Sequence, residues 1–100
     1  MNVLTRIKRL VLKGRYIFTE KAAAEIDFDD LSEDDVVESI LSARRVVTKR
    51  STSSDRLPAD KVYILTAPNF SGLWIYTKGV IRRLNGDENF YILISAKKER

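Results

Sequence analysis

Residues 73 to 98 read LWIYTKGVIRRLNGDENFYILISAKK, and this stretch decides the fold. Two runs rich in β-branched and aromatic residues flank residues 85 to 88 (NGDE), a composition typical of a hairpin turn. The stretch therefore predicts two antiparallel strands. If Leu84 lies opposite Asn89 across the turn, counting back along both strands predicts four further pairs. These are Arg82 with Tyr91, Val80 with Leu93, Lys78 with Ser95, and Tyr76 with Lys97.

Opposed residues of an antiparallel pair lie on the same face of a sheet, so this register assigns each side chain to a face. One face is predicted to be a cationic working surface that carries Tyr76, Lys78, Arg82, Tyr91, Ser95 and Lys97. The other face is predicted to pack into the core. Its apolar residues are Leu73, Ile75, Ile81, Phe90, Ile92, Ile94 and Ala96, and its polar exceptions are Thr77 and Arg83. A bulge at Gly79 would shift the far half of the hairpin by one residue.

A second hairpin is predicted from residues 62 to 67 (VYILTA), the turn-forming residues 68 to 72 (PNFSG) and the strand that follows. If Ala67 lies opposite Gly72, then Ile64 faces Ile75 and Tyr63 faces Tyr76. Tyr63 and Lys61 would then join the cationic face, and Val62, Ile64 and Thr66 the core face. Residues 44 to 49 (RRVVTK) are a further candidate strand.

Three helices are predicted ahead of this sheet. Apolar residues recur at helical spacing over residues 2 to 13, with Gly14 suited to the end of that helix. Thr19 is typical of an N-cap before residues 20 to 26. Ser32 with Asp35 resembles a capping box before residues 33 to 42. The sequence thus predicts one α+β domain over residues 1 to 100, with N-terminal helices packed on one face of a small, mainly antiparallel sheet.

The composition of the 100 residues narrows the possible chemistry. There is no Cys and no His, which removes thiolate chemistry, the commonest metal ligand and the usual general base. We therefore predict no metal and no cofactor. No apolar run approaches the roughly 18 residues that a membrane span needs, and the N-terminus lacks a signal-peptide pattern. The sequence predicts a cytoplasmic protein without a membrane partner.

Charge is unevenly distributed along the chain. The net charge is +4, yet residues 22 to 40 hold eight acidic and no basic side chains, which leaves 18 basic against 6 acidic residues elsewhere. Such a basic remainder favours polyanions, above all RNA or DNA, and the alternative is an ordinary solvated surface. Glu33, Asp34 and Asp35 suit the dipole of the helix that they begin, so we predict no metal site there.

The cationic face supports one reaction in the absence of His and Cys. RNA can be cleaved without a metal by attack of the ribose 2′-OH on the adjacent phosphate, which needs charge stabilisation, a proton acceptor and a donor for the leaving oxygen. A lysine crowded by other cations is one candidate for the acceptor. The candidate residues are Tyr63, Tyr76, Lys78, Arg82 and Lys97, joined by Lys49 or Arg50 and by phosphate contacts from Ser51 and Ser53 in the following loop. The alternative is a binding surface without catalysis.

Several segments together resemble a known family. They are IKRLVLKG at residues 7 to 14, FTEKA at 18 to 22, the RSTS loop at 50 to 53, IYTKG at 75 to 79 and FYILISAKK at 90 to 98. They resemble MqsR-family toxins, which belong to the RelE-like mRNA interferases of type II toxin–antitoxin pairs. The resemblance implies a RelE-like fold and ribosome-independent cleavage of mRNA at a short sequence. It also implies inactivation by a cognate antitoxin protein, with DNA bound only indirectly through the toxin–antitoxin complex.

The resemblance also implies particular site residues. The strand tyrosine of the family falls on Tyr76, the C-terminal lysine on Lys97, and the loop lysine on Lys49 or Arg50. The family also uses a glutamine before the second sheet strand; this chain has no Gln, so that role is vacant or is filled by Lys61. Three alternatives stay open: a non-catalytic RNA- or DNA-binding module, ribosome-dependent cleavage of the RelE type, and an interaction domain whose acidic residues 22 to 40 dock a basic partner.

Overall fold

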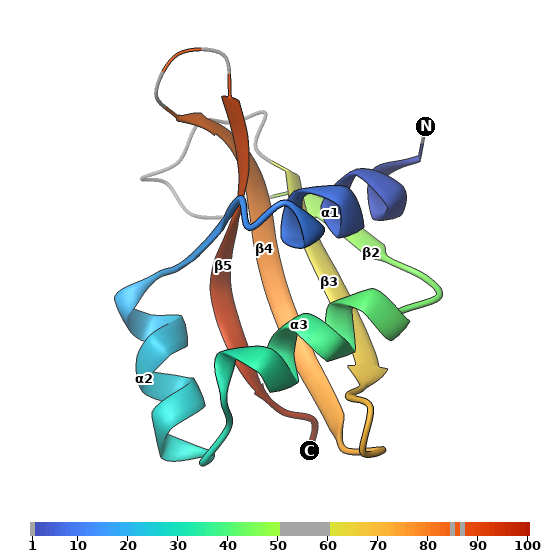
Figure 1. Cartoon of the computed structure of the whole chain (residues 1–100), viewed down its shortest axis with the longest axis vertical. Coiled ribbons are helices and arrows are strands. Elements are labelled where there is room, and N and C mark those ends of the chain that lie inside the picture. Colours follow the sequence, from blue (N-terminus) through green and yellow to red (C-terminus); the bar gives the residue numbers. More distant parts are fainter. Residues whose placement is uncertain (1, 51–60, 85, 87) are drawn as a thin grey trace.

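The computed structural model describes residues 2 to 50, 61 to 84, 86 and 88 to 100 of the chain (Figure 1). Within these residues there are three helices and five strands; the first strand follows the first helix, and the other four strands follow the third helix. Their bounds are α1 Val3–Leu12, β1 Tyr16–Phe18, α2 Glu20–Phe28, α3 Glu33–Ser42, β2 Val47–Arg50, β3 Lys61–Pro68, β4 Trp74–Leu84 and β5 Glu88–Lys98.

The strands form one sheet in the order β1-β5-β4-β3-β2. β1 runs parallel to β5, and the other three pairings are antiparallel. In Figure 1, α1 and α3 cross one face of the sheet, and α2 lies along the lower part of β5. This confirms the predicted α+β fold with N-terminal helices and a mainly antiparallel sheet. No helix among the described residues is long and apolar enough to span a membrane.

Each helix begins after an N-cap residue whose side chain accepts a hydrogen bond from a backbone N–H of the first turn. The Asn2 carboxamide oxygen accepts the Thr5 N–H at 2.8 Å, and the Thr19 hydroxyl accepts the Ala22 N–H at 3.1 Å. Ser32 and Asp35 form the reciprocal capping box, with bonds of 3.1 and 2.9 Å between each side chain and the other's backbone N–H. The predicted caps of the second and third helices are therefore confirmed.

The core fills the space between the helices and one face of the sheet, which we call the helix-covered face. Its fully buried side chains include Ile7, Ala22, Val36, Ile40, Leu65, Ile75, Tyr91, Leu93 and Ala96. One buried polar group also fastens α3 to the sheet, since the Ser39 hydroxyl donates to the Ala67 carbonyl at 2.8 Å. The opposite side of the sheet, which alternates with these positions along β3 and β4, is the open face.

The predicted β4–β5 register is correct up to a bulge and wrong beyond it. Tyr76 pairs with Lys97, as expected. Between Lys78 and Gly79 the register shifts, because Ile94 of β5 has no partner on β4. Beyond this point the observed pairs are Gly79 with Leu93, Val80 with Ile92, Ile81 with Tyr91, Arg82 with Phe90 and Leu84 with Glu88. The predicted pairs Val80–Leu93, Arg82–Tyr91 and Leu84–Asn89 are therefore wrong.

This shift moves a tyrosine from the predicted working surface into the core. Tyr91 and Leu93 are fully buried on the helix-covered face, whereas Phe90 and Ile92 occupy register positions of the open face. Gly79 makes room for the Tyr91 ring, since a Cβ at Gly79 would lie 2.5 Å from the Tyr91 Cζ. The apolar face was therefore assigned correctly for Ile75 and Ile81, but not for Phe90 and Ile92.

The predicted β3–β4 register is also wrong. Ala67 pairs with Ile75 rather than with Gly72, because the turn is longer than expected. Asn69 organises this turn: its carboxamide oxygen accepts the N–H groups of Ser71 and Leu73 at 3.0 and 2.8 Å. An odd shift exchanges the two faces of a strand, so Tyr63 packs against the core from the helix-covered face. Ile64 and Thr66 take open-face positions instead.

Candidate functional site

Tyr76 and Lys97 form a pair on the open face, near the start of β4 and the end of β5. They lie directly opposite each other on β4 and β5. The Lys97 ammonium stands 5.7 Å from the centroid of the Tyr76 ring, a cation–π geometry. It also lies 4.0 Å from Glu25 Oε2, and the Lys97 side chain remains 44% exposed. An accessible ammonium is therefore held between a carboxylate and a phenol.

Glu25 fixes this arrangement from α2. Its Oε1 accepts the Ser95 hydroxyl at 2.7 Å and the Ala96 N–H at 3.2 Å, which leaves Oε2 towards Lys97. At the C-terminal cap of α2, Asp29 accepts the Lys98 N–H at 2.8 Å. The two carboxylates thus accept hydrogen bonds from backbone N–H groups of β5 beyond Leu93, where the pairing of β5 with β1 has ended. Glu25 is a site residue that the sequence analysis missed.

Lys78 belongs to the same face. It lies opposite Ser95 and diagonal to Lys97, a relation that places two residues roughly 7–8 Å apart. Its side chain is half-buried. Two cations and one phenol therefore gather on three adjacent register positions, which suits contact with a phosphate group.

Lys49 also takes an open-face position, since it pairs with Val62 at the edge strand β2. It is exposed. The next residue, Arg50, pairs with Lys61. Because side chains alternate along a strand, Arg50 and Lys61 both lie on the side of the sheet opposite to Tyr76. Of the two alternatives for a loop cation, only Lys49 is aligned with the open face.

The remaining predicted site residues do not lie beside Tyr76 and Lys97. Arg82 lies on the open side of β4 but six residues from Tyr76, which is about 20 Å along a strand. Tyr63 lies on the helix-covered face, against the core. Ser51 and Ser53 lie outside the described residues, as does most of the loop that was expected to contact phosphate.

A groove adjoins Lys97 between α2 and the end of β5. It has a volume of about 650 Å³ and is lined by Lys21, Ala24, Glu25, Phe28, Asp29, Lys97 and Arg100. At its far end Arg100 donates to Asp29 at 2.6 Å. This hydrogen bond, with that from the Lys98 N–H, holds the pKa of the Asp29 carboxyl below its ordinary value.

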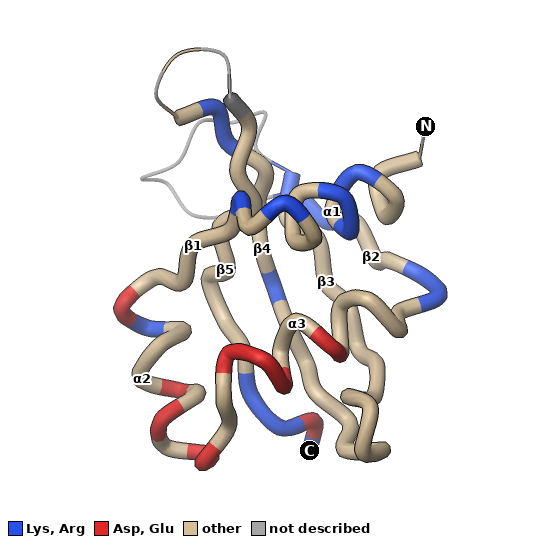
Figure 2. Tube along the Cα trace, viewed as in Figure 1, with Lys and Arg blue, Asp and Glu red and all other residues tan. Residues whose placement is uncertain are grey.

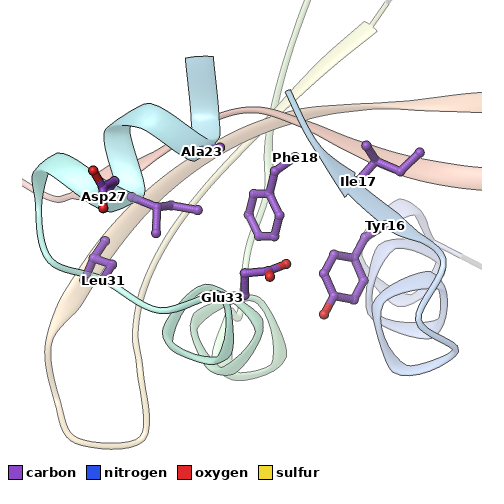
Figure 3. A pocket seen from close by; sticks show the side chains of 8 residues that line it. Tyr16, Ile17, Phe18, Ala23, Asp27, Leu31 and Glu33 are labelled. Carbon is purple, nitrogen blue, oxygen red and sulfur yellow. The ribbon is translucent and has the colours of Figure 1, made fainter. Parts of the chain in front are cut away.

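A second pocket lies on the opposite side of the sheet, and Figure 3 shows it between β1, α2 and the start of α3. It has a volume of about 550 Å³, and its walls are mainly apolar, with Phe18 and Leu31 among them. Its charged residues are the carboxylates Asp27 and Glu33. A pocket of this charge repels phosphate, so it does not serve as an RNA site.

The distribution of charged residues also separates an acidic region from basic ones. Figure 2 shows acidic residues gathered on α2 and α3, and basic residues along α1 and at the C-terminal end of β5. The segregation seen along the sequence is therefore also a segregation in space. Among the described residues no group of His, Cys, Asp and Glu side chains could hold a metal ion.

Comparison of the chain with protein-family models, with curated proteins and with solved structures gave no match.

Proposed function

We propose that this chain is an endoribonuclease that cleaves RNA on the open face of its sheet, as the toxin of a type II toxin–antitoxin pair. The observation that carries the proposal is the Lys97 ammonium held 5.7 Å from the Tyr76 ring centroid, with Lys78 diagonal to it. The resemblance of residues 75 to 79 and 90 to 98 to MqsR-family toxins supports the same tyrosine and lysine.

The proposed reaction is an in-line displacement at phosphorus. The ribose 2′-oxygen forms a bond to phosphorus while the bond from phosphorus to the 5′-oxygen breaks. The 2′-OH proton passes to a basic group or to water, and the departing 5′-oxygen takes up a proton. The products are a 2′,3′-cyclic phosphate and a 5′-hydroxyl, and the step consumes no metal and no other reactant.

Each residue of the site has a role that its chemistry allows. Lys97 and Lys78 stabilise the negative charge that builds on the phosphate oxygens in the transition state. Tyr76 positions the phosphate or donates a proton to the leaving oxygen. Glu25 acts through Lys97 and is a positioning residue. Lys49 supplies a further cation at the edge of the open face, where the flanking RNA would lie.

The proposal includes partners. The substrate is mRNA, and a cognate antitoxin protein inhibits the enzyme. Contact with DNA is indirect, through the toxin–antitoxin complex. The proposed place of action is the cytoplasm, where mRNA is exposed.

A non-catalytic RNA-binding module is the second candidate. It is favoured by the exposed residues of the open face, where Trp74 is 53% exposed and the Lys97 side chain 44% exposed. A basic face with apolar neighbours binds a nucleic acid strand whether or not it cleaves it. The two candidate functions differ in whether Tyr76 and Lys97 take part in cleavage of the bound strand.

The test is cleavage of a defined mRNA by the purified protein in EDTA, with and without ribosomes. The 3′ ends of the products are assayed for a cyclic phosphate. Tyr76→Phe is compared with Tyr16→Phe, which removes a phenol from the pocket of Figure 3 instead.

We expect cuts at a recurring short sequence without ribosomes, a cyclic phosphate at the 3′ ends, and a rate reduced about 10²-fold or more by Tyr76→Phe alone. Cleavage only with ribosomes would replace this proposal by the RelE type. RNA binding that weakens steeply with salt, without any cleavage, would establish the binding module.

A further inference from the structure

Trp74 occupies the open face beside the proposed catalytic pair. It precedes Tyr76 by two residues on β4 and so projects to the same side of the sheet, about 6.7 Å away along the strand. The Glu99 N–H donates to the Trp74 carbonyl at 3.0 Å, which extends the ladder and sets Lys97 diagonal to Trp74. Lys97 therefore has Tyr76 opposite it and Trp74 and Lys78 on its two diagonals.

The indole of Trp74 is unusually exposed for its size. Its exposed fraction is 53%, although a tryptophan normally buries most of its large apolar surface. On β3 the residue opposite it is Pro68, and the next open-face residue is the exposed Thr66, so β3 has no large side chain there to cover the ring. The indole is thus available to a ligand.

The cations beside Trp74 select the kind of ligand. An exposed aromatic surface alone fits a protein partner equally well, but Lys78 and Lys97 make this part of the open face complementary to a polyanion. Aromatic rings that alternate with cations bind single-stranded nucleic acid, because the bases stack on the rings while the phosphates meet the cations. A base-paired strand keeps its bases in the duplex and cannot use the ring in this way.

We propose that Trp74 stacks on an unpaired base of the RNA next to the phosphate held by Lys97. This inference rests on the proposed function, and it deepens it by naming the residue that binds an unpaired base beside the reacting phosphate. Trp74 then holds the strand in register with Tyr76 and Lys97, and it takes no part in the bond changes.

The chain offers a direct optical test, since Trp74 is its single tryptophan. The probe is a fluorescein-labelled 12-nucleotide 2′-O-methyl RNA, which binds but lacks the attacking hydroxyl. Its anisotropy reports binding of the strand, and the Trp74 emission, measured with the unlabelled oligonucleotide, reports stacking. The variants are Trp74→Ala, Trp74→Phe and, as a matched control, Phe70→Ala. Phe70 is a 70% exposed aromatic residue of the β3–β4 turn, outside the strands.

We expect the single strand to quench Trp74 emission and the same sequence as a duplex to leave it unchanged. Trp74→Ala should weaken single-strand binding roughly 5- to 150-fold, the usual range for one stacked base. Trp74→Phe should restore most of that loss, and Phe70→Ala should bind as the wild type does.

Two results would overturn the inference, and they differ in what they leave standing. If the anisotropy shows binding without quenching, and Trp74→Ala binds normally, stacking is wrong while the RNA-binding face remains. If neither the wild type nor any variant binds the single strand, the proposed function fails together with this inference.

Discussion

The β4–β5 ladder has two halves, which meet at the bulge between Lys78 and Gly79. In the lower half, from Trp74 to Lys78, one face carries the tyrosine and the lysines and the other face packs under the helices. In the upper half the side chains of β5 still alternate between the two faces, and Tyr91 lies in the core. A single unpaired residue, Ile94, thus decides which tyrosine is available to a ligand and which is structural.

The comparison shows that residue type does not identify a working residue in a strand. Tyr76 and Tyr91 are both strand tyrosines, and both were assigned to the cationic face. Only their register separates them, because side chains alternate with a period of two and one inserted residue reverses every later position.

The largest stability effect is expected from Gly79→Ala in the upper half. The new Cβ would lie 2.5 Å from Tyr91 Cζ and 2.9 Å from the Ile92 carbonyl oxygen, so the ring and the strand must move. Overpacking of this kind costs about 1–3 kcal/mol, and we expect the upper end of that range in urea unfolding.

A double-mutant cycle supplies the control for Gly79→Ala. In a Tyr91→Leu background the ring is gone, so the cost of Gly79→Ala should fall, although the Ile92 carbonyl still limits it. Equal costs in both backgrounds would mean that Gly79 does not make room for Tyr91.

The lower half should depend on its contact with α2. Glu25→Ala removes the acceptor of the buried Ser95 hydroxyl and of the Ala96 N–H, and we expect a loss of about 1–2 kcal/mol. Glu20→Ala, an exposed change on the same helix, should cost less. If the two variants unfold alike, Glu25 does not fasten the edge of β5.

Tyr91→Phe should show that the Tyr91 phenol is structural. Its hydroxyl is buried without a hydrogen-bond partner among the described residues, so its removal should be neutral or stabilising by up to about 1 kcal/mol. Burial, with a smaller effect of Tyr63, raises the pKa of the Tyr91 phenol above its ordinary value of about 10.

The sign of that pKa shift gives a second measurement on the same variant. A raised pKa in the folded state means that unfolding releases a proton at alkaline pH, so stability falls as the pH rises above about 10. This alkaline loss should be smaller in Tyr91→Phe than in the wild type. An equal loss in both proteins would contradict the buried, unpartnered phenol.

The smallest effect concerns Asp29 at the end of the lower half. The hydrogen bond from Arg100, followed by that from the Lys98 N–H, lowers the pKa of this carboxyl. A lowered pKa contributes stability that is present above the ordinary value of about 4 and is lost as the pH falls below it. Asp29→Asn should therefore unfold more easily at neutral pH, and the difference should shrink below pH 4. A difference that is constant with pH would contradict the contact.

Features fixed by neighbouring residues could be predicted from the sequence. Thr19, and Ser32 with Asp35, cap helices through bonds within three residues, so their spacing is sufficient to identify them. The Tyr76–Lys97 pair was predicted correctly, but only because two errors cancel: Leu84 pairs with Glu88 rather than with Asn89, and the unpaired Ile94 then restores the counted register.

Features that depend on distant contacts could not be predicted. The bulge is linked to the packing of the Tyr91 ring over Gly79, which the helices enclose. The β3–β4 register depends on how the Asn69 side chain folds the turn. Glu25 lies in an alanine-rich helix without any motif, and only the docking of α2 against β5 brings it to Lys97.

The central claim is that the open face is the working surface, and Lys97 and Lys98 test it most directly. Both are lysines at the end of β5, but Lys97 pairs with Tyr76 and Lys98 with the core residue Ile75. The measurement is the rate of cleavage of one defined RNA in EDTA by Lys97→Ala and by Lys98→Ala. We predict that Lys97→Ala lowers the rate about 10²- to 10³-fold and that Lys98→Ala changes it less than tenfold. Equal losses in the two variants, or a greater loss in Lys98→Ala, would contradict the assignment of the open face.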